Sequence, residues 1–90
     1  IESMIDAAVE QGLDRKQAAA LAMQTALGAA QMTIASDETP AELRRKVTSP
    51  NGTTQAAIES LQQDNFAQTI KTAMQACYAR SEEISKELAD

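Results

Sequence analysis

One polar stretch of this chain combines residue types and spacing that could do chemistry: Val-Thr-Ser-Pro-Asn-Gly-Thr-Thr at positions 47–54. Most of the remaining chain consists of alanine, leucine, glutamine, methionine and glutamate, which build helices. Within the stretch, Pro50 fixes its own φ and pushes Ser49 into an extended conformation. Asn51-Gly52 is a strong signal for a backbone reversal with positive φ. The pattern therefore predicts a tight turn between two helices.

A helix is expected directly after this turn, beginning near Gln55 and capped by Thr53 or Thr54. The first N–H groups of a helix have no partner within it, and the positive end of the helix dipole lies beside them. Such a place favours a small anion, for example a carboxylate. An ordinary connection between two helices is the competing interpretation of the same residues.

The size of the chain and its alanine content limit the core that it can build by itself. Ninety residues form one domain at most, and so short a chain buries a smaller fraction of its surface than an average domain. Apolar residues make up 43% of the chain, but Phe66 and Tyr78 are its only aromatic residues. Because alanine contributes little buried area, we expect another copy or another domain to complete the core.

Charge and residue usage argue against several classes of protein. The net charge is −5 and the one basic cluster is Arg44-Arg45-Lys46, which disfavours nucleic-acid binding. With no histidine and one thiol, Cys77, no metal site is expected, and a reduced, cytoplasmic location is favoured. We find neither a membrane-spanning apolar run nor a signal-peptide pattern, so no membrane association is expected. Asp37 and Glu38 are interpreted as a solvated acidic loop rather than as part of a site.

Apolar residues recur at helical spacing along the chain without any strand pattern, so the predicted fold is all-α with about five helices. The start of the chain already looks helical, as in a piece of a longer protein. The predicted helices span residues 1–12, 15–35, 40–46, 55–64 and 67–88. Signals for their ends are Gly12, Asp14 with Gln17, Thr39 with Glu42, and Asn65.

The second predicted helix is the central one, because Leu21, Thr25 and Gly28 share one face and many alanines keep its surface shallow. A glycine in the middle of a helix costs about 1 kcal/mol relative to alanine. We therefore expect another helix to cross close to Gly28. Phe66 is expected to fill the corner before the last helix.

The window of residues 40–61 resembles the signature of the Δ1-pyrroline-5-carboxylate reductase family, which catalyses the last step of proline biosynthesis. That signature reads Leu-x-x-x-Val-x-Ser-Pro-Gly-Gly-Thr-Thr, and Leu43, Val47 and residues 49–54 match its offsets. One departure is Asn51, which stands where glycine is more usual. Asparagine tolerates a left-handed φ, so the turn can survive. The likeness extends over essentially all 90 residues.

The resemblance implies an enzyme of two domains that reduces 1-pyrroline-5-carboxylate with NADPH or NADH. In the family, an N-terminal Rossmann domain binds the cofactor. A C-terminal helical domain, of the 6-phosphogluconate-dehydrogenase-like type, dimerises and carries the substrate loop. This chain resembles only the second domain, because it has no Gly-x-Gly-x-x-Gly turn after a strand. The implied partner is a second copy of the chain in a homodimer, and assembly of dimers into rings is left open. The 90 residues alone are expected to be inactive.

By the same resemblance, the active site lies at the dimer interface and the loop of residues 47–54 binds the substrate. The backbone N–H groups of Asn51, Gly52, Thr53 and Thr54 are expected to hold the substrate carboxylate. Ser49 would add a hydroxyl donor. Thr54 is the expected catalytic residue, forming a hydrogen bond to the ring nitrogen as it becomes an amine.

Two other interpretations stay open at this point. In a free-standing all-α interaction or oligomerisation module, the Pro-Asn-Gly turn would be a plain connection without a catalytic role. A related two-domain dehydrogenase would keep the enzyme class but act on another substrate. Which nicotinamide cofactor is preferred is decided by residues outside this chain.

Overall fold

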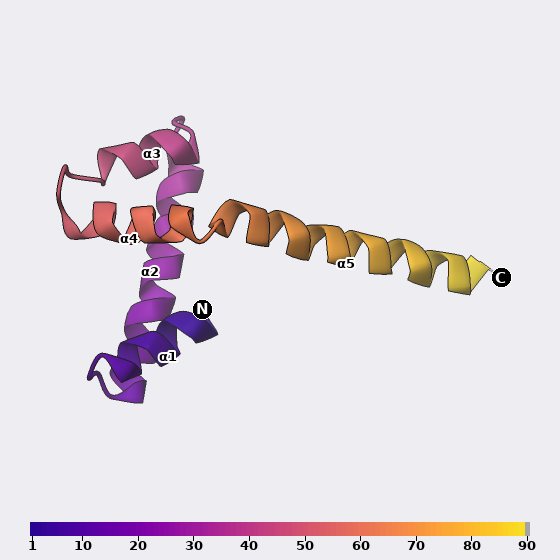
Figure 1. Ribbon diagram of the computed structural model, residues 1–90, viewed down its shortest axis with the longest axis horizontal. Helices are drawn as coiled ribbons and strands as arrows, with labels where there is room; N and C mark the ends of the chain where they lie inside the picture. The colour runs from indigo at the N-terminus through magenta and orange to yellow at the C-terminus, as the bar shows by residue number, and fades with distance from the viewer. Residues whose placement is uncertain (90) are drawn as a thin grey trace. The chain divides into compact units, whose positions relative to one another are not determined.

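The protein, described here by a computed structural model for residues 1–89, consists of helices joined by short connections (Figure 1). Five helices follow in order: α1 (Glu2–Glu10), α2 (Arg15–Ala35), α3 (Pro40–Lys46), α4 (Thr53–Gln63) and α5 (Phe66–Ala89). No strand occurs in this range, so the predicted all-α class and the number of helices are confirmed. The chain divides into two units, residues 1–46 and a second unit that begins at Val47.

In the first unit, α1 and α2 pack on each other and are joined by a tight connection at Gly12. Gly12 has a φ of +112°, and its N–H donates a hydrogen bond to the carbonyl of Val9 (3.0 Å). The N–H of Leu13 donates to the carbonyl of Ala8 (3.2 Å). This pair of bonds is the Schellman pattern, which satisfies carbonyls that the end of a helix leaves without partners. The predicted role of Gly12 is confirmed.

The start of α2 is fixed by Asp14, whose side chain accepts a hydrogen bond from the N–H of Gln17 (2.9 Å). This is the predicted N-cap, and it satisfies one of the free N–H groups of the first turn. An exposed ion pair between Arg15 and Asp6 (3.0 Å) links the start of α2 to α1. Because both side chains are largely exposed, that ion pair contributes little to stability.

The buried core found in residues 1–89 consists of two alanines, Ala18 (0% exposed) and Ala22 (6% exposed). They lie one helical turn apart on α2, and the half-buried residues of α1 are Ile5, Ala8 and Val9. Small side chains at this contact let the two helices approach closely, but they bury little area. The thin core expected from the composition is therefore confirmed for this unit.

Much of α2 remains uncovered within its own unit. Beyond Lys16 the helix carries no charged residue up to its end at Ala35. Large apolar side chains such as Leu21, Leu27 and Ile34 are at least half exposed. A helix that is apolar on several sides is typically buried in the finished molecule.

In the second unit, α5 follows α4 after a short break in the helix (Figure 1), and Asp64 and Asn65 separate the two helices. Asn65 adopts a left-handed φ of 57°, and its N–H donates a hydrogen bond to the carbonyl of Gln62 (3.1 Å). The predicted ending of this helix at Asn65 is thus confirmed. Phe66 is the first residue of α5 and is 49% exposed, so the expectation that it fills the corner is wrong for the single chain.

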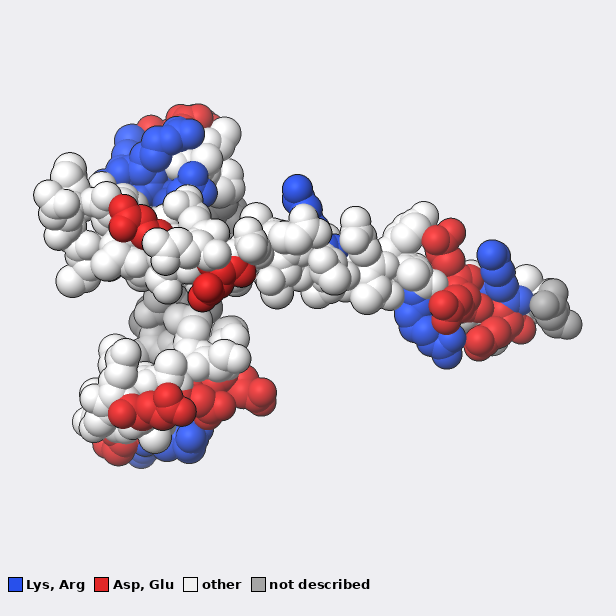
Figure 2. All heavy atoms as spheres, viewed as in Figure 1, with Lys and Arg blue, Asp and Glu red and all other residues white. Residues whose placement is uncertain are grey.

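The two halves of α5 differ in character (Figure 2). Lys71 is the one charged residue between Phe66 and Ala79, whereas the last turns contain ion pairs from Arg80 to Glu83 and Glu87. The N-terminal half of α5 exposes the large side chains Ile70, Met74 and Tyr78, together with the free thiol of Cys77. No helix in the described part of the chain is long and apolar enough to cross a membrane.

Candidate functional site

The loop of residues 47–54 contains a hydrogen-bonded turn from Ser49 to Gly52. The N–H of Gly52 donates to the carbonyl of Ser49 (3.0 Å), with Pro50 and Asn51 at the two central positions. Asn51 has a φ of 61°, the positive value predicted from the Asn-Gly pair. Proline at the second position and a left-handed residue at the third are the pattern of a type II turn.

Gly52 ends the turn and starts α4. It is the N-cap residue, with extended φ and ψ of −87° and 177°, and its carbonyl accepts the N–H of Ala56 (3.2 Å). The prediction that Thr53 or Thr54 caps a helix beginning near Gln55 is therefore wrong: both threonines are the first residues of α4. The physical reason is that the extended backbone of Gly52 already completes the turn, so the helix begins directly after it.

The backbone N–H groups expected to bind a carboxylate fall into two classes in this structure. Those of Asn51 and Gly52 are already bonded, the first to the side-chain Oε1 of Gln55 and the second to the carbonyl of Ser49. Those of Thr53 and Thr54 lie in the first turn of α4, where a helix provides no acceptor. Within residues 1–89 they have no hydrogen-bond acceptor.

Gln55, the third residue of α4, contacts this loop and was not predicted as part of the site. Its side chain accepts from the N–H of Asn51 and donates to the carboxylate of Glu59 (2.9 Å). A glutamine three residues after the N-cap is part of the capping-box signal, in which its side chain reaches back to the N-cap N–H. Here the N–H of Gly52 is taken by Ser49, and Gln55 bonds the preceding N–H instead. Asp14 with Gln17 has a side chain at the N-cap, whereas Gly52 has none, so the residue types at positions 52 and 55 give only half of this signal.

The hydroxyl groups of Ser49 and Thr54 complete the set of polar groups predicted for the site. Both residues are exposed, and neither hydroxyl has a hydrogen-bond partner within residues 1–89. A hydroxyl can donate one hydrogen bond and accept two, so it can serve either a carboxylate or a ring nitrogen. The turn and the start of α4 thus offer hydroxyls and N–H donors without any charged side chain among residues 47–54.

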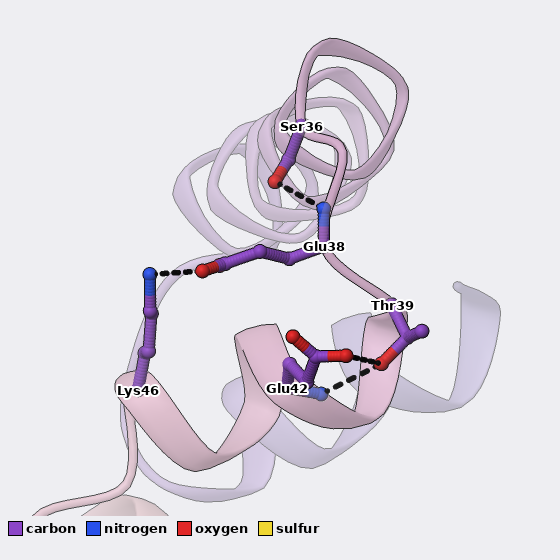
Figure 3. Close-up of polar contacts among 5 residues, drawn as sticks. All are labelled: Ser36, Glu38, Thr39, Glu42 and Lys46. Atoms are coloured by element: carbon purple, nitrogen blue, oxygen red, sulfur yellow. Dashed lines mark hydrogen bonds and ion pairs between the residues drawn. The ribbon is translucent and has the colours of Figure 1, made fainter.

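The acidic loop before α3 is organised by its own contacts (Figure 3). The N–H of Glu38 donates to the hydroxyl of Ser36 (3.0 Å), and the Glu38 carboxylate forms an ion pair with Lys46. Thr39 caps α3, because its hydroxyl accepts the N–H of Glu42 (3.2 Å) and donates to the Glu42 carboxylate (3.0 Å). The carboxylate of Glu38 is therefore half-buried and neutralised within its own unit rather than freely solvated.

The end of α3 carries the basic cluster Arg44, Arg45 and Lys46, which forms a compact blue patch in Figure 2. Cations are favoured at the negative C-terminal end of a helix, so the cluster needs no bound anion to explain it. Among the described residues, no three histidine, cysteine, aspartate or glutamate side chains lie together in a way that could hold a metal ion.

The fold and the loop together indicate a class of protein: an all-α domain with many exposed apolar side chains and a polar turn directly before the start of a helix. The chain belongs to the pyrroline-5-carboxylate reductase dimerisation family, whose sequence model matches residues 1–84. The resemblance inferred from residues 40–61 is thereby confirmed.

Individual relatives agree with this assignment. A pyrroline-5-carboxylate reductase of Pseudomonas aeruginosa is 50% identical over 88 residues, which make up 98% of this chain and 32% of the relative. A Synechocystis protein of the same name is 43% identical over 86 residues, or 96% of this chain and 32% of the relative. This chain thus spans about a third of the length of the curated relatives it matches.

Two solved structures share the fold. A pyrroline-5-carboxylate reductase from Coxiella burnetii superimposes with a TM-score of 0.86 at 38% identity, over 91% of this chain and 30% of that chain. The Plasmodium falciparum pyrroline carboxylate reductase with NADP bound gives a TM-score of 0.81 at 36% identity, over 83% of this chain and 29% of that chain. The helical architecture therefore matches the solved members of the family.

Proposed function

We propose that this chain is the C-terminal dimerisation and substrate-loop domain of a pyrroline-5-carboxylate reductase. The full-length protein reduces 1-pyrroline-5-carboxylate to L-proline with NADPH or NADH, in the cytoplasm. The observation that carries the proposal is the family match over residues 1–84, which includes the polar turn. The NADP in the Plasmodium falciparum relative supports a nicotinamide cofactor, which we assign to a Rossmann domain in the rest of the protein.

In this reaction the main task of the domain is to position the substrate, and little acid–base catalysis is needed from it. Hydride transfer to the imine carbon requires the cofactor ring and the substrate ring to be held face to face. The N–H groups of Thr53 and Thr54 have no acceptor within residues 1–89 and lie at the positive end of α4, where a carboxylate is favoured. In this proposal they bind the substrate carboxylate, the Ser49 hydroxyl adds a third donor, and Asn51 and Gly52 shape the turn.

Thr54 is the residue that we assign to the ring nitrogen. Its hydroxyl is exposed beside the two free N–H groups and has no other partner within residues 1–89. As the imine is reduced, the nitrogen becomes an amine, and a hydroxyl can hydrogen bond to it before and after the transfer. Because an iminium ion arrives already protonated, Thr54 orients the substrate and does not supply the proton.

A homodimer completes the proposal. The exposed apolar side chains of α2 and α5 need a cover, and the matching family is defined as a dimerisation domain. In the proposed assembly the second copy supplies that cover, and the loop of residues 47–54 lies at the interface. Further assembly of dimers into rings is compatible with the proposal and is not needed for it.

The test is a steady-state assay of the full-length protein with 1-pyrroline-5-carboxylate and each nicotinamide cofactor. We expect NAD(P)H oxidation that depends on this substrate and yields L-proline, and no activity from residues 1–90 alone. Turnover of another cyclic or open-chain imine with a much higher kcat/KM would assign a different substrate. A full-length protein that oxidises no nicotinamide cofactor with any imine would favour an oligomerisation module without a catalytic role.

A further inference from the structure

The side chain of Gln55 connects the substrate loop to the body of α4. Its Oε1 accepts the N–H of Asn51 and its Nε2 donates to the carboxylate of Glu59 (2.9 Å). An amide N–H can meet only the oxygen of a carboxamide, and a carboxylate can meet only its NH₂ group. Glu59 therefore fixes the orientation of the Gln55 carboxamide, with its oxygen toward the loop.

This connection acts on the left-handed residue of the turn. Asn51 has a φ of 61°, a conformation that most residues with a side chain avoid and that asparagine tolerates. The hydrogen bond from its N–H to Gln55 holds this peptide group against α4. The bond from Gly52 to Ser49 (3.0 Å) closes the turn itself. Two hydrogen bonds thus hold the loop: Gly52 to Ser49 within the turn, and Asn51 to Gln55 of the following helix.

The charge distribution along the same face of α4 affects how well an anion can bind at the start of the helix. Gln55 is neutral and lies in the first turn of α4, whereas the nearest acid on this face, Glu59, lies one turn further along. An anion at the helix start would be repelled by a carboxylate at position 55 and much less by one at position 59. A glutamine therefore gives the loop its acceptor without adding negative charge next to Thr53 and Thr54.

We propose that Gln55 is a positioning and specificity residue for anionic substrates: it holds Asn51 in the left-handed conformation while keeping the start of α4 free of negative charge. The inference rests on the proposed function, because it takes the substrate to bind at Thr53 and Thr54. Gln55 touches no reacting atom in this scheme and acts through the loop.

Three variants of the full-length protein test this role. Gln55→Leu removes the acceptor. The double variant Gln55→Glu with Glu59→Gln reverses the Gln55–Glu59 contact, so that both hydrogen bonds can form but the charge moves one turn closer to the loop. Gln63→Leu is the control, because Gln63 is an exposed glutamine of α4 outside the loop. The measurements are kcat, the KM values for 1-pyrroline-5-carboxylate and for the cofactor, and the melting temperature.

We expect Gln55→Leu to raise the KM for 1-pyrroline-5-carboxylate roughly three- to tenfold, the effect of losing one ordinary hydrogen bond. The double variant should raise this KM about tenfold through like-charge repulsion. Its melting temperature should stay at or above the original value, since an acid near a helix N-terminus is favourable. The KM for the cofactor should stay unchanged in both, and Gln63→Leu should match the original protein throughout.

Two results would overturn the inference alone. One is reductase activity with an unchanged KM for 1-pyrroline-5-carboxylate in both Gln55 variants. The other result is a combination of two observations. The double variant has the same kinetic constants and melting temperature as the original protein, and Gln55→Leu has a lower melting temperature with weaker binding of both substrate and cofactor. A purely structural role of Gln55 predicts this combination. A full-length protein that reduces no 1-pyrroline-5-carboxylate would instead overturn the proposed function, and this inference with it.

Discussion

Gly52 and Ser49 approach each other closely in the turn that precedes α4. The N–H of Gly52 donates to the carbonyl oxygen of Ser49 at 3.0 Å, and a Cβ atom built on Gly52 would lie 3.2 Å from that oxygen and 3.5 Å from the Cβ of Ser49. Gly52 has a φ of −87°, which any residue can adopt. Glycine is therefore favoured here by the close approach of two backbone segments and not by the backbone conformation.

We expect Gly52→Ala to lower the free energy of unfolding by about 1 kcal/mol, because the Ser49 carbonyl must move while it still accepts the hydrogen bond. The same shift should raise the KM for 1-pyrroline-5-carboxylate in the full-length protein. Urea unfolding and steady-state kinetics measure the two effects. Ser60→Ala, at an exposed position later in α4, is the control and should be neutral or slightly stabilising. An unchanged stability of Gly52→Ala would show that the turn has room to relax.

Thr54→Ala in the full-length protein should lower kcat/KM for 1-pyrroline-5-carboxylate at least about tenfold, since it removes a hydrogen bond to a nitrogen that carries charge during the reaction. Thr54→Ser keeps the hydroxyl and should retain most of the activity. Cofactor affinity, measured by fluorescence titration, should stay the same in both variants. Equal losses of substrate and cofactor affinity in Thr54→Ala would contradict the role assigned to this hydroxyl.

Residues 1–90 alone should form a dimer at micromolar concentration. Ala18 and Ala22 are the whole buried core found in residues 1–89, and so small a core cannot offset the conformational entropy lost on folding. A second copy would cover the exposed apolar side chains of α2 and α5. Light scattering and sedimentation measure the mass in solution. A folded monomer at this concentration would contradict the prediction.

Gly28→Leu should weaken the dimer about tenfold or more, because a large side chain at a helix crossing prevents close approach. Among residues 1–89 of one chain, a Cβ at Gly28 meets nothing within 4 Å. Any loss of association must therefore come from a contact with the partner. Gly28→Ala serves as the comparison, since alanine should stabilise α2 by about 1 kcal/mol through helix propensity. Sedimentation over a range of concentrations gives the dimer dissociation constants of the two variants and of the original protein. Equal dissociation constants for Gly28→Leu and the original protein would exclude a helix crossing at Gly28.

Asp14→Ala should lower the free energy of unfolding by about 0.5–2 kcal/mol, the usual cost of losing an N-cap. Asp14 accepts the N–H of Gln17 at 2.9 Å, and alanine leaves that donor without a protein partner. The control Asp37→Ala removes an exposed aspartate that makes no hydrogen bond or ion pair within residues 1–89, and it should change stability far less. Denaturant unfolding of the two variants under identical conditions gives the difference.

Local sequence signals predicted the ends of most helices correctly. Gly12 and Asn65 both adopt left-handed conformations at the ends of helices, and Asp14 and Thr39 cap the helices that follow them. Each of these signals involves residues within a few positions of one another, so no distant contact is needed to decide the outcome. Family membership was likewise readable from the chain, because residues 47–54 combine several residue types at fixed offsets.

The sequence by itself determined the all-α class, the helix order and the position of the polar turn, because these follow from helical periodicity and short-range capping. Only the three-dimensional structure decided that Gly52, and not a threonine, caps α4, and that Gln55 bonds the N–H of Asn51. Several acceptor oxygens lie near the same few backbone N–H groups. Which oxygen accepts each hydrogen bond depends on backbone geometry that residue types do not specify. The structure also decided which apolar side chains one chain can cover by itself. Periodicity shows which face of a helix is apolar, but it does not show what covers that face. The apolar side chains of α2 and α5 that stay exposed in one chain are the example here.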